Sequence, residues 1–541
     1  MAAVESSSHE RSKWVRLSVF RFDPAQDEQS RYQEFRVPLT HGMTLLEALN
    51  YIKDELDPTL SFRQGCRSAI CGSCAVRVNK RSCLACRTRI TDKLAEELIV
   101  IDPLSHLPVV RDLVVDMTPF YDRLRQVQPY LIGNAVVERT TLIDPAELAE
   151  SRTMRGCIAC GACYSDCNVL DVESTFLGPA AIVSALRYAK DPRDRNSGRA
   201  ANALELGLYK CPVDQECEFA CPKEIQIRRG AIEKLREMAV SQGLGPMAEH
   251  KRLINSVITT GGVVCITSKP ATEMFPEYIK EFEGDAQAEV VLFFGCIINR
   301  RKQNVARAII NILQANRVAV HIPRRALCCG SPFMRIGQRS SIKPFVENNF
   351  NIFNSYADQG VTDILTSCSG CNSTFRHDFP SLAKTFDIPL RFNIFDVGEY
   401  LMNRIQFYTR HLKSVNIKGM YHYPCHIKAS GLAEEIYINL LNRIPGVELV
   451  KVPRSGYCCG GGGGVRAAFP SLADKLALRR IEIAREAGVD TLITNCPFCV
   501  MSFERVLDQK KRAGERIQFR IIDFYEMLSE AYGMPSTCEI D

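Results

Sequence analysis

The sequence of 541 residues predicts a multidomain protein with a small strand-rich domain, a helical domain and a larger, duplicated α/β part. Three observations predict this fold class. Cysteines gather in groups with fixed spacings, a pattern with five cysteines occurs twice in the C-terminal half, and apolar strands alternate there with amphipathic helices. We expect a flexible N-terminus at 1–13 and domains at 14–105, 106–255, 256–410 and 411–541.

The composition excludes several classes of protein. The net charge is only +6 and no long basic run occurs, so nucleic-acid binding is not expected. The N-terminal MAAVESSSHERSK has no apolar signal-peptide core. The longest apolar runs, such as VVLFFGCII, reach about half of a membrane span. We expect a soluble, cytoplasmic chain whose contact with a membrane is peripheral or made through another subunit.

The chain contains 24 cysteines. A disulfide scaffold would be short and secreted, and this chain fits neither description. Clustered cysteines in a reducing compartment indicate metal or iron–sulfur sites, and the spacing of the cysteines separates these possibilities.

The first cysteine group predicts a [2Fe–2S] site. Cys66, Cys71 and Cys74 follow the C-x4-C-x2-C spacing of plant-type clusters, and Cys86 supplies the fourth thiolate. Cys83 in SCLAC is the other candidate for that position, and a zinc site is the alternative for the whole group. The strand-like VRLSVFRF and YQEFRV, followed by the helical TLLEALNYIKDEL, give the order of a β-grasp ferredoxin domain.

Two further cysteine blocks, CIACGACYSDC and CPVDQECEFACP, predict two clusters in a helical ferredoxin domain. The last cysteine of such a run ligates the other cluster. One set is therefore a [4Fe–4S] site, formed by Cys157, Cys160, Cys163 and Cys221. The other set is Cys167, Cys211 and Cys217, with Asp214 where a fourth cysteine would be. Three thiolates predict [3Fe–4S], and Asp214 as an oxygen ligand leaves [4Fe–4S] open.

The C-terminal half contains the internal repeat, and CCG marks the paired cysteines of each copy. We call 256–410 the first CCG repeat and 411–541 the second CCG repeat. Their cysteines are expected at strand ends, where parallel α/β folds place ligands. The two sets are Cys296, Cys328, Cys329, Cys368, Cys371 and Cys425, Cys458, Cys459, Cys496, Cys499. Cys83, Cys265 and Cys538 stay unassigned; Cys265 is expected on a buried strand and Cys538 at the surface.

The segments RQGCRSAICGSCAVRVN, GPAAIVSALRYAKDPRD and CEFACPKEI resemble the iron–sulfur subunit of succinate dehydrogenases and fumarate reductases. The resemblance covers about residues 14 to 240. It implies three clusters in line, from an FAD-containing flavoprotein subunit at the [2Fe–2S] end to a quinone-reactive membrane subunit. One departure is CNVLDVESTF after Cys167, which lacks the tryptophan of that family; the only tryptophan here is Trp14.

The C-terminal half resembles the CCG-domain subunit of heterodisulfide reductase and other CCG-domain proteins, including PCH at 424–426. The resemblance implies one noncubane [4Fe–4S] cluster for each set of five cysteines. A structural zinc in one repeat is the alternative, although five ligands exceed a tetrahedral shell. Cys425, Cys458, Cys459 and His426 are the predicted catalytic residues, and His377 and His422 are further candidate proton donors.

Five glycines, Gly460 to Gly464, follow the paired cysteines of the second CCG repeat, whereas the first has Ser331, Pro332 and Phe333 after its CCG. Gly460, Gly461 and Gly462 are predicted to give a bulky cluster room. We expect the first repeat's cluster to be enclosed and to relay electrons. We expect the second to face an open pocket and to exchange electrons with the outer partner.

These patterns predict the iron–sulfur electron-transfer subunit of a succinate dehydrogenase or fumarate reductase. The chain has no dinucleotide fingerprint after a strand, so FAD is expected in a partner. A quinone-linked partner is preferred at the CCG end. The alternative is a thiol-driven fumarate reductase, which oxidises coenzyme M and coenzyme B thiols to a heterodisulfide. A non-catalytic scaffold or sensor is disfavoured because five cluster sites occur without an effector domain.

Overall fold

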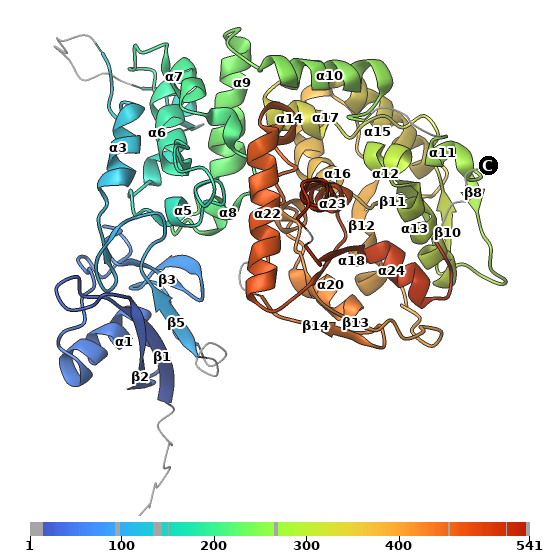
Figure 1. Ribbon diagram of the computed structural model, residues 1–541. Coiled ribbons are helices and arrows are strands. Elements are labelled where there is room, and N and C mark those ends of the chain that lie inside the picture. Colours follow the sequence, from blue (N-terminus) through green and yellow to red (C-terminus); the bar gives the residue numbers. More distant parts are fainter. Residues whose placement is uncertain are drawn as a thin grey trace, which may run out of the picture. The chain divides into compact units, whose positions relative to one another are not determined.

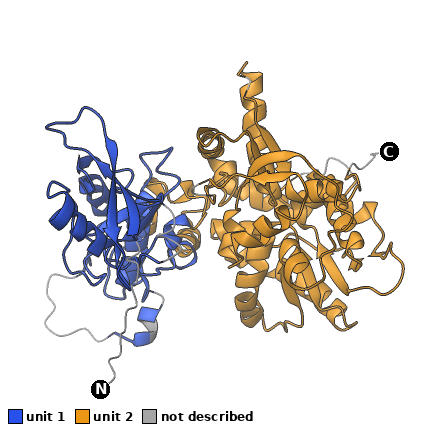
Figure 2. Cartoon of the chain, turned by 90° about the horizontal axis from the view of Figure 1, so that it is seen from below, with its two compact units in different colours: residues 1–199, 216–231 blue, residues 200–215, 232–541 orange. Residues whose placement is uncertain are grey.

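The computed structural model describes residues 14–91, 98–133, 143–149, 151–264, 269–452, 455–515 and 517–536. The chain forms two compact units, residues 1–199 with 216–231 and residues 200–215 with 232–541 (Figure 2). The segment 106–255 contributes to both units, whereas both CCG repeats belong to the second. The five domain boundaries remain a prediction.

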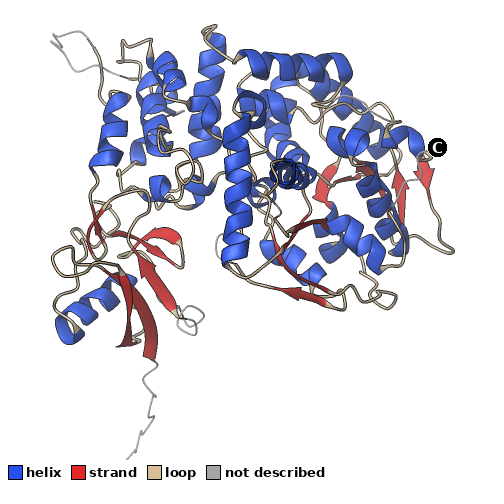
Figure 3. Ribbon diagram, viewed as in Figure 1, coloured by secondary structure: helices blue, strands red, loops and turns tan. Residues whose placement is uncertain are grey.

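The first unit begins with a five-stranded mixed sheet of order β2-β1-β5-β3-β4 (Figures 1 and 3). β1 pairs with β2 antiparallel and with β5 parallel. Helix α1 (Leu45–Tyr51) begins at a capping box between Thr44 and Glu47. The two strands and the helix predicted for this region are confirmed. The strands are β1 (Trp14–Arg21), β2 (Arg31–Pro38), β3 (Ala75–Val78), β4 (Arg81–Leu84) and β5 (Ile99–Asp102).

Apart from a short antiparallel pair, β6 (Val109–Arg111) and β7 (Val114–Val115), the rest of the first unit is mainly helical. It is joined to the five-stranded sheet through buried hydrogen bonds. The backbone N–H of Ser82 on β4 donates to Asp166 at 3.0 Å, and the Ser82 hydroxyl donates to the same carboxylate at 2.6 Å. Asp166 directly follows α5, so the strand and this helix are held together. The helices used below are α3 (Thr118–Gln126), α5 (Ala162–Ser165), α6 (Pro179–Ala189) and α8 (Glu216–Phe219).

The second unit contains two sheets with the same internal order, β12-β11-β9-β10-β8 and β14-β13-β15-β16. All neighbours are parallel except β8, which is antiparallel to β10. The predicted duplication of an α/β unit on parallel strands is confirmed. The strands are β8 (Tyr278–Ile279), β9 (Ala288–Phe293), β10 (Val318–His321), β11 (Asp363–Thr366), β12 (Asn393–Asp396), β13 (Ile417–Tyr421), β14 (Val447–Leu449), β15 (Thr491–Thr494) and β16 (Arg520–Asp523).

The two repeats share one hydrophobic core, which includes Val290 and Leu365 of the first repeat and Ile493 and Leu528 of the second. Helix α13 (Gln303–Ala315) packs against α24 (Phe524–Ala531) and buries its apolar face there. The repeats therefore form a single body, with the loops at the carboxyl ends of both sheets available to build one site.

Arg236 on α9 (Glu233–Ser241) links the repeats to the segment that precedes them. Its side chain is completely buried and donates to the carbonyl oxygens of Arg335 (2.7 Å), Gly463 (3.1 Å), Leu208 (2.9 Å) and Cys211 (2.7 Å). One guanidinium thus satisfies four separate peptide groups, all within the second unit. Of the helices that the structure describes, none is long and apolar enough to cross a membrane.

Candidate iron–sulfur centres

The loop that carries Cys66, Cys71 and Cys74 turns its backbone amides toward thiol sulfurs. The N–H groups of Ser68, Ile70 and Cys71 donate to Cys66 Sγ at 3.3–3.4 Å. Arg67 and Ala69 adopt left-handed φ angles of 56° and 55°, which turn these amides inward. Such hydrogen bonds stabilise thiolates and suit the ligand loop of a plant-type cluster.

The fourth position distinguishes Cys86 from Cys83. Ala69 N–H donates to Cys86 Sγ at 3.3 Å, so Cys86 belongs to the same network as the loop. Cys83 lies on β4 opposite Val76, and burial raises the pKa of its thiol to about 11. This geometry favours Cys86 as the fourth ligand, and the ligand role stays a prediction.

Gly72 brings the first cysteine loop against the second. A Cβ atom at this position would lie 2.7 Å from Cys160 Cβ, and the residue has a φ of +76°. Both facts require glycine. The Cys66–Cys74 loop and the Cys157–Cys163 loop therefore touch directly within the first unit.

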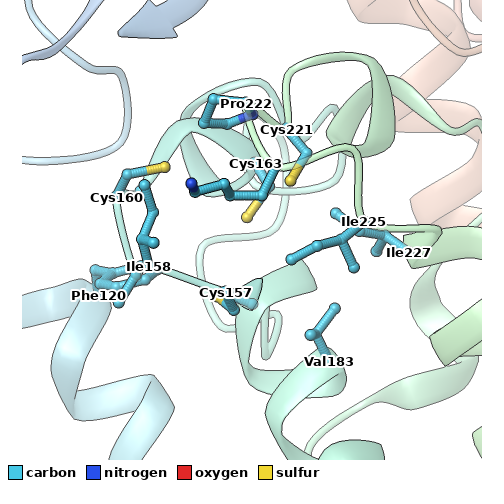
Figure 4. A pocket seen from close by; sticks show the side chains of 14 residues that line it. Phe120, Cys157, Ile158, Cys160, Cys163, Val183, Cys221, Pro222, Ile225 and Ile227 are labelled. Atoms are coloured by element: carbon cyan, nitrogen blue, oxygen red, sulfur yellow. The ribbon is translucent and has the colours of Figure 1, made fainter. Parts of the chain in front are cut away.

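Cys157, Cys160, Cys163 and Cys221 line one pocket (Figure 4). The first three lie in α5 or just before it, and Cys221 follows α8. Apolar side chains complete the wall: Phe120, Val183, Ile225 and Ile227. Burial raises the pKa of Cys160 to about 11, and burial also raises the pKa of Cys163 well above its ordinary value. Four thiols that line one pocket with apolar side chains provide the donor set of a [4Fe–4S] cluster.

The set of Cys167, Cys211 and Cys217 divides between the units, because Cys211 belongs to the second and the other two to the first. The set therefore stays a prediction. All three cysteines are buried, as is Asp214. Val213 and Gln215 on either side of Asp214 have left-handed φ angles of 56° and 72°, which marks an unusual loop.

The cysteines of the CCG repeats lie at strand ends, as expected. Cys296 follows β9, Cys368 follows β11, Cys425 follows β13 and Cys496 follows β15. Cys368 and Cys496 are the N-cap residues of α16 (Ser369–Ser373) and α23 (Pro497–Arg512). The matching positions confirm that the repeat seen in the sequence is also a structural repeat.

One cavity of about 370 Å³ lies between the repeats. We call it the inter-repeat cavity. Its lining includes all five cysteines of the first repeat and Cys425, Cys459, Cys496 and Cys499 of the second. The expectation of an enclosed first site and an open second site is wrong, because both cysteine sets face the same space.

The two pairs of adjacent cysteines, Cys328–Cys329 and Cys458–Cys459, show the same pattern of pKa shifts. Hydrogen bonds from Cys328 and Cys371 lower the pKa of Cys329 to about 6. Hydrogen bonds from Cys458 and Cys499 likewise lower the pKa of Cys459. The second cysteine of each CC pair is therefore where negative charge is best tolerated, and the thiolate is the form that binds metal.

The glycine run packs against backbone as well as against the cavity. A Cβ at Gly460 would lie 2.3 Å from Ala473 O, and one at Gly462 would lie 2.7 Å from Pro212 O. Gly463 would meet Cys211 O at 2.7 Å. Gly461 faces Ser502 Oγ and Cys459 Sγ instead. Gly460, Gly463 and Gly464 also have positive φ angles. Glycine is thus required for close packing against 211–213, which the sequence did not indicate.

The histidines differ in their access to the cavity. His426 lines it, with Nδ1 3.7 Å from Cys425 Sγ. His422 is buried behind it against Phe503, and burial lowers the pKa of His422 to about 3, so this ring is neutral. His377 is exposed and is not among the lining residues that the structure describes. Cys265 and Cys538 lie outside the described residues.

Three polar residues of the cavity could not be found by cysteine spacing. Arg466 and Arg505 line it and approach the same carboxylate, Asp474. Arg466 Nη2 is buried without a hydrogen-bond partner in the described structure. Ser369 also lines the cavity, and its hydroxyl donates to Cys496 Sγ at 3.0 Å. The signal that the sequence offered was Arg466, two residues after the glycine run.

Three family models match the chain. They are a 2Fe-2S iron–sulfur cluster binding domain at 16–122, a 4Fe-4S dicluster domain at 153–225, and a cysteine-rich CCG domain at 290–376 and again at 420–504. The [2Fe–2S] and [4Fe–4S] binding domains and the two CCG repeats predicted from the sequence are therefore confirmed.

The chain is similar to proteins of known name along its length. A subunit of the fumarate reductase (CoM/CoB) of Methanothermobacter marburgensis is 33% identical over 520 residues, covering 96% of this chain and 99% of that protein. The fumarate reductase iron–sulfur subunit of Haemophilus influenzae is 36% identical over 247 residues, covering 42% of this chain and 95% of that protein.

A crystal structure of a hypothetical protein from Helicobacter pylori has the same fold, with a TM-score of 0.61 at 14% identity, and covers 97% of this chain and 96% of that chain. The relatives are oxidoreductase components, and their domains carry electrons on iron–sulfur clusters. The chain therefore belongs to the family of fused iron–sulfur electron-transfer subunits that includes the matching subunit of fumarate reductase (CoM/CoB).

Proposed function

We propose that this chain carries electrons between an FAD-containing flavoprotein subunit, which interconverts succinate and fumarate, and a quinone-linked partner reached through the CCG repeats. The observation that carries the proposal is the inter-repeat cavity, which gathers nine cysteines of two repeats at the carboxyl ends of parallel strands. Five thiols for each site exceed the four ligands of a structural zinc.

The ligand sets are proposed as the sequence predicts them, in a β-grasp domain, a helical two-cluster domain and the CCG repeats. The three-thiol set with Asp214 would hold [3Fe–4S], and each CCG repeat would hold a noncubane [4Fe–4S]. Bound clusters supply one-electron carriers. The chain's own residues hold the thiolates, supply amide donors to the sulfurs and exclude water from the sites. We expect the complex in the cytoplasm, with a membrane-docking subunit where quinone is the partner.

Two close backbone approaches, one within each unit, support short links in the proposed route. Gly72 meets Cys160 between the first and second ligand loops. Gly462 and Gly463 meet Pro212 and Cys211 between the third set and the second CCG repeat. In both places glycine removes the side chain that would hold two ligand-bearing segments apart.

A thiol-driven fumarate reductase is the second candidate. The relative of similar length is named for CoM and CoB, and the cavity contains a feature that suits charged thiols. Arg466 Nη2 is buried and has no hydrogen-bond partner among the described residues, and Arg466 and Arg505 approach the same carboxylate, Asp474. This arrangement leaves positive charge for an acidic group of a ligand.

The test is an assay of the complex purified with its flavoprotein. A quinone analogue and the thiols coenzyme M and coenzyme B are compared as partners of fumarate and succinate. We expect turnover with the quinone analogue and a [3Fe–4S] signal in the oxidised protein. Turnover with thiols alone would favour the second candidate. Turnover with neither, in a protein with full iron content, would contradict the proposal.

A further inference from the structure

Ser369 connects the two CCG repeats at their cysteines. It lies between Cys368 and Cys371 of the first repeat, at the first position of α16, and is 1% exposed. Its hydroxyl donates to the sulfur of Cys496, a cysteine of the second repeat 127 residues away, at 3.0 Å. Because a buried hydroxyl is costly unless it is paired, this hydrogen bond offsets the burial of the Ser369 side chain.

The contact has no counterpart in the other direction. The corresponding residue of the second repeat is Pro497, at the first position of α23 between Cys496 and Cys499. Proline has neither a hydroxyl nor a backbone N–H, so it can donate to no sulfur. Two repeats with equivalent cysteines therefore differ in one hydrogen bond to a ligand sulfur.

A hydrogen bond to a ligand sulfur disperses the negative charge of the thiolate and favours the reduced, more negative state of a cluster. Hydrogen bonds to sulfur are among the factors that set cluster potentials. A donor from within the second repeat is also present, because Gly460 N–H donates to Cys458 Sγ at 3.3 Å. Ser369 is the donor that crosses between repeats.

We propose that the Ser369 hydroxyl raises the reduction potential of the second-repeat cluster above that of the first-repeat cluster, so that an electron in the cavity resides mainly on the second-repeat side. The step is the transfer of one electron from one site to the other, and no proton is required. The inference rests on the proposed function in one respect, namely that both repeats bind clusters.

The test is a redox titration of the complete complex followed by electron paramagnetic resonance. Signals are assigned to the repeats with Cys296→Ser and Cys425→Ser. In the wild type the second-repeat cluster should have the higher midpoint potential. Ser369→Ala should lower that potential alone and change the one-electron equilibrium constant between the sites about tenfold, which is about 59 mV.

Matched variants separate a hydrogen-bond effect from a packing effect. Ser502→Ala removes another buried serine of the cavity, for which no hydrogen bond to a cysteine is seen among the described residues, and should leave both potentials unchanged. Ser369→Thr keeps the hydroxyl and should restore the wild-type difference.

Three results would overturn the inference: a higher potential at the first repeat in the wild type, no change in Ser369→Ala, or equal shifts of both clusters. The wild-type result decides even if the alanine variant does not assemble. Failure of the proposed function has a different signature, since iron analysis of the wild type would then find a repeat without a cluster.

Discussion

The two CCG repeats place equivalent cysteines on equivalent strands and differ in the chain that follows the paired cysteines. In the first repeat Gly330 leads directly into α14 (Ser331–Ile336). In the second, five glycines come before the short helix α21 (Val465–Ala468), and two of them, Gly462 and Gly463, lie against Pro212 and Cys211. The comparison teaches that duplication provides the site, whereas the loop after CCG adapts one repeat to the segment that carries Cys211.

The largest expected effect tests whether the glycine run is a packing requirement. Gly460→Ala places Cβ 2.3 Å from Ala473 O at a φ of +74°. We expect it to lower the free energy of unfolding of the second unit by about 3 kcal/mol or more, measured by thermal and denaturant unfolding. Gly431→Ala is the matched control, with the same φ and no atom within 4 Å, and should cost about 1 kcal/mol. Equal losses would contradict the packing role.

The next effect concerns the contact between the glycine run and Pro212. Gly462→Val would displace the 211–213 backbone, because its Cβ lies 2.7 Å from Pro212 O. We expect electron transfer into the CCG repeats to slow on the order of 100-fold, measured by rapid-freeze spectroscopy, with the [2Fe–2S] site and the [4Fe–4S] site of Cys157 to Cys221 still reduced normally. Gly461→Val, whose nearest neighbour is the Ser502 hydroxyl at 2.9 Å, should slow it less. If Gly461→Val slowed electron transfer more than Gly462→Val, the contact with the cavity would matter more for electron transfer than the contact with Pro212.

A smaller effect concerns Arg466 and Arg505 of the second repeat, which line the inter-repeat cavity and approach the same carboxylate. If the partner is an acidic thiol, Arg466→Gln should raise KM for the thiol about 10- to 30-fold, because a charge-assisted hydrogen bond is lost. Turnover with a quinone analogue should hardly change. Arg479→Gln, at a surface cluster with Glu486, is the control. An equal change with both partners would show that Arg466 stabilises the folded structure and does not bind the thiol.

The smallest effect tests a feature that the repeats share. Asp396 and Asp523 cap α18 (Val397–Asn403) and α24, and burial raises the pKa of Asp396 to about 6 and that of Asp523 to about 7. Since both values exceed that of the unfolded chain, the folded state retains these protons longer. Their stabilisation is complete below about pH 4 and is lost as the pH rises through 6 to 7.

Asparagine at either position keeps the cap and removes this titration. The free energy of unfolding of the second unit should therefore fall less between pH 4 and 8 in Asp523→Asn and in Asp396→Asn. Each variant should flatten this dependence, because each removes a carboxyl group whose pKa burial raises. Urea unfolding at several pH values measures the pH dependence of the free energy of unfolding, and Asp508→Asn at an exposed position is the control. If the free energy of unfolding depends on pH in both variants as it does in the wild type, Asp396 and Asp523 do not contribute to that dependence.

Local pattern was enough to predict the strands and the positions of the cysteines. Residues 14–21 alternate with the period of a strand, and the cysteine spacings reflect the loops that hold clusters. The repeat was visible because both copies keep their cysteines at the same offsets from apolar strands. These signals lie within short segments, so no knowledge of distant contacts was needed.

The contacts between distant segments could not be predicted in this way. Nothing near Ser369 indicates that its hydroxyl reaches Cys496, and nothing near Gly462 indicates Pro212. The prediction of an open and an enclosed site failed for this reason, since it treated each loop alone while the two sheets face one cavity. Packing partners far apart in sequence are set by the whole fold.

The contacts of Arg236 determine where the chain can be divided into separately folding fragments. The sequence has the form of a ferredoxin part joined to a CCG cassette, and such a cassette would be expected to function when excised. The carbonyl groups of Arg335 and Gly463 nevertheless depend on a guanidinium that precedes the repeats, and the same guanidinium binds the carbonyl of Cys211. A gene fragment that begins at the first repeat would therefore expose unsatisfied peptide groups beside its cluster loops. The segment that joins the ferredoxin part to the CCG repeats is therefore packed against the repeats. A fragment that keeps all the contacts of Arg236 must begin upstream of Leu208.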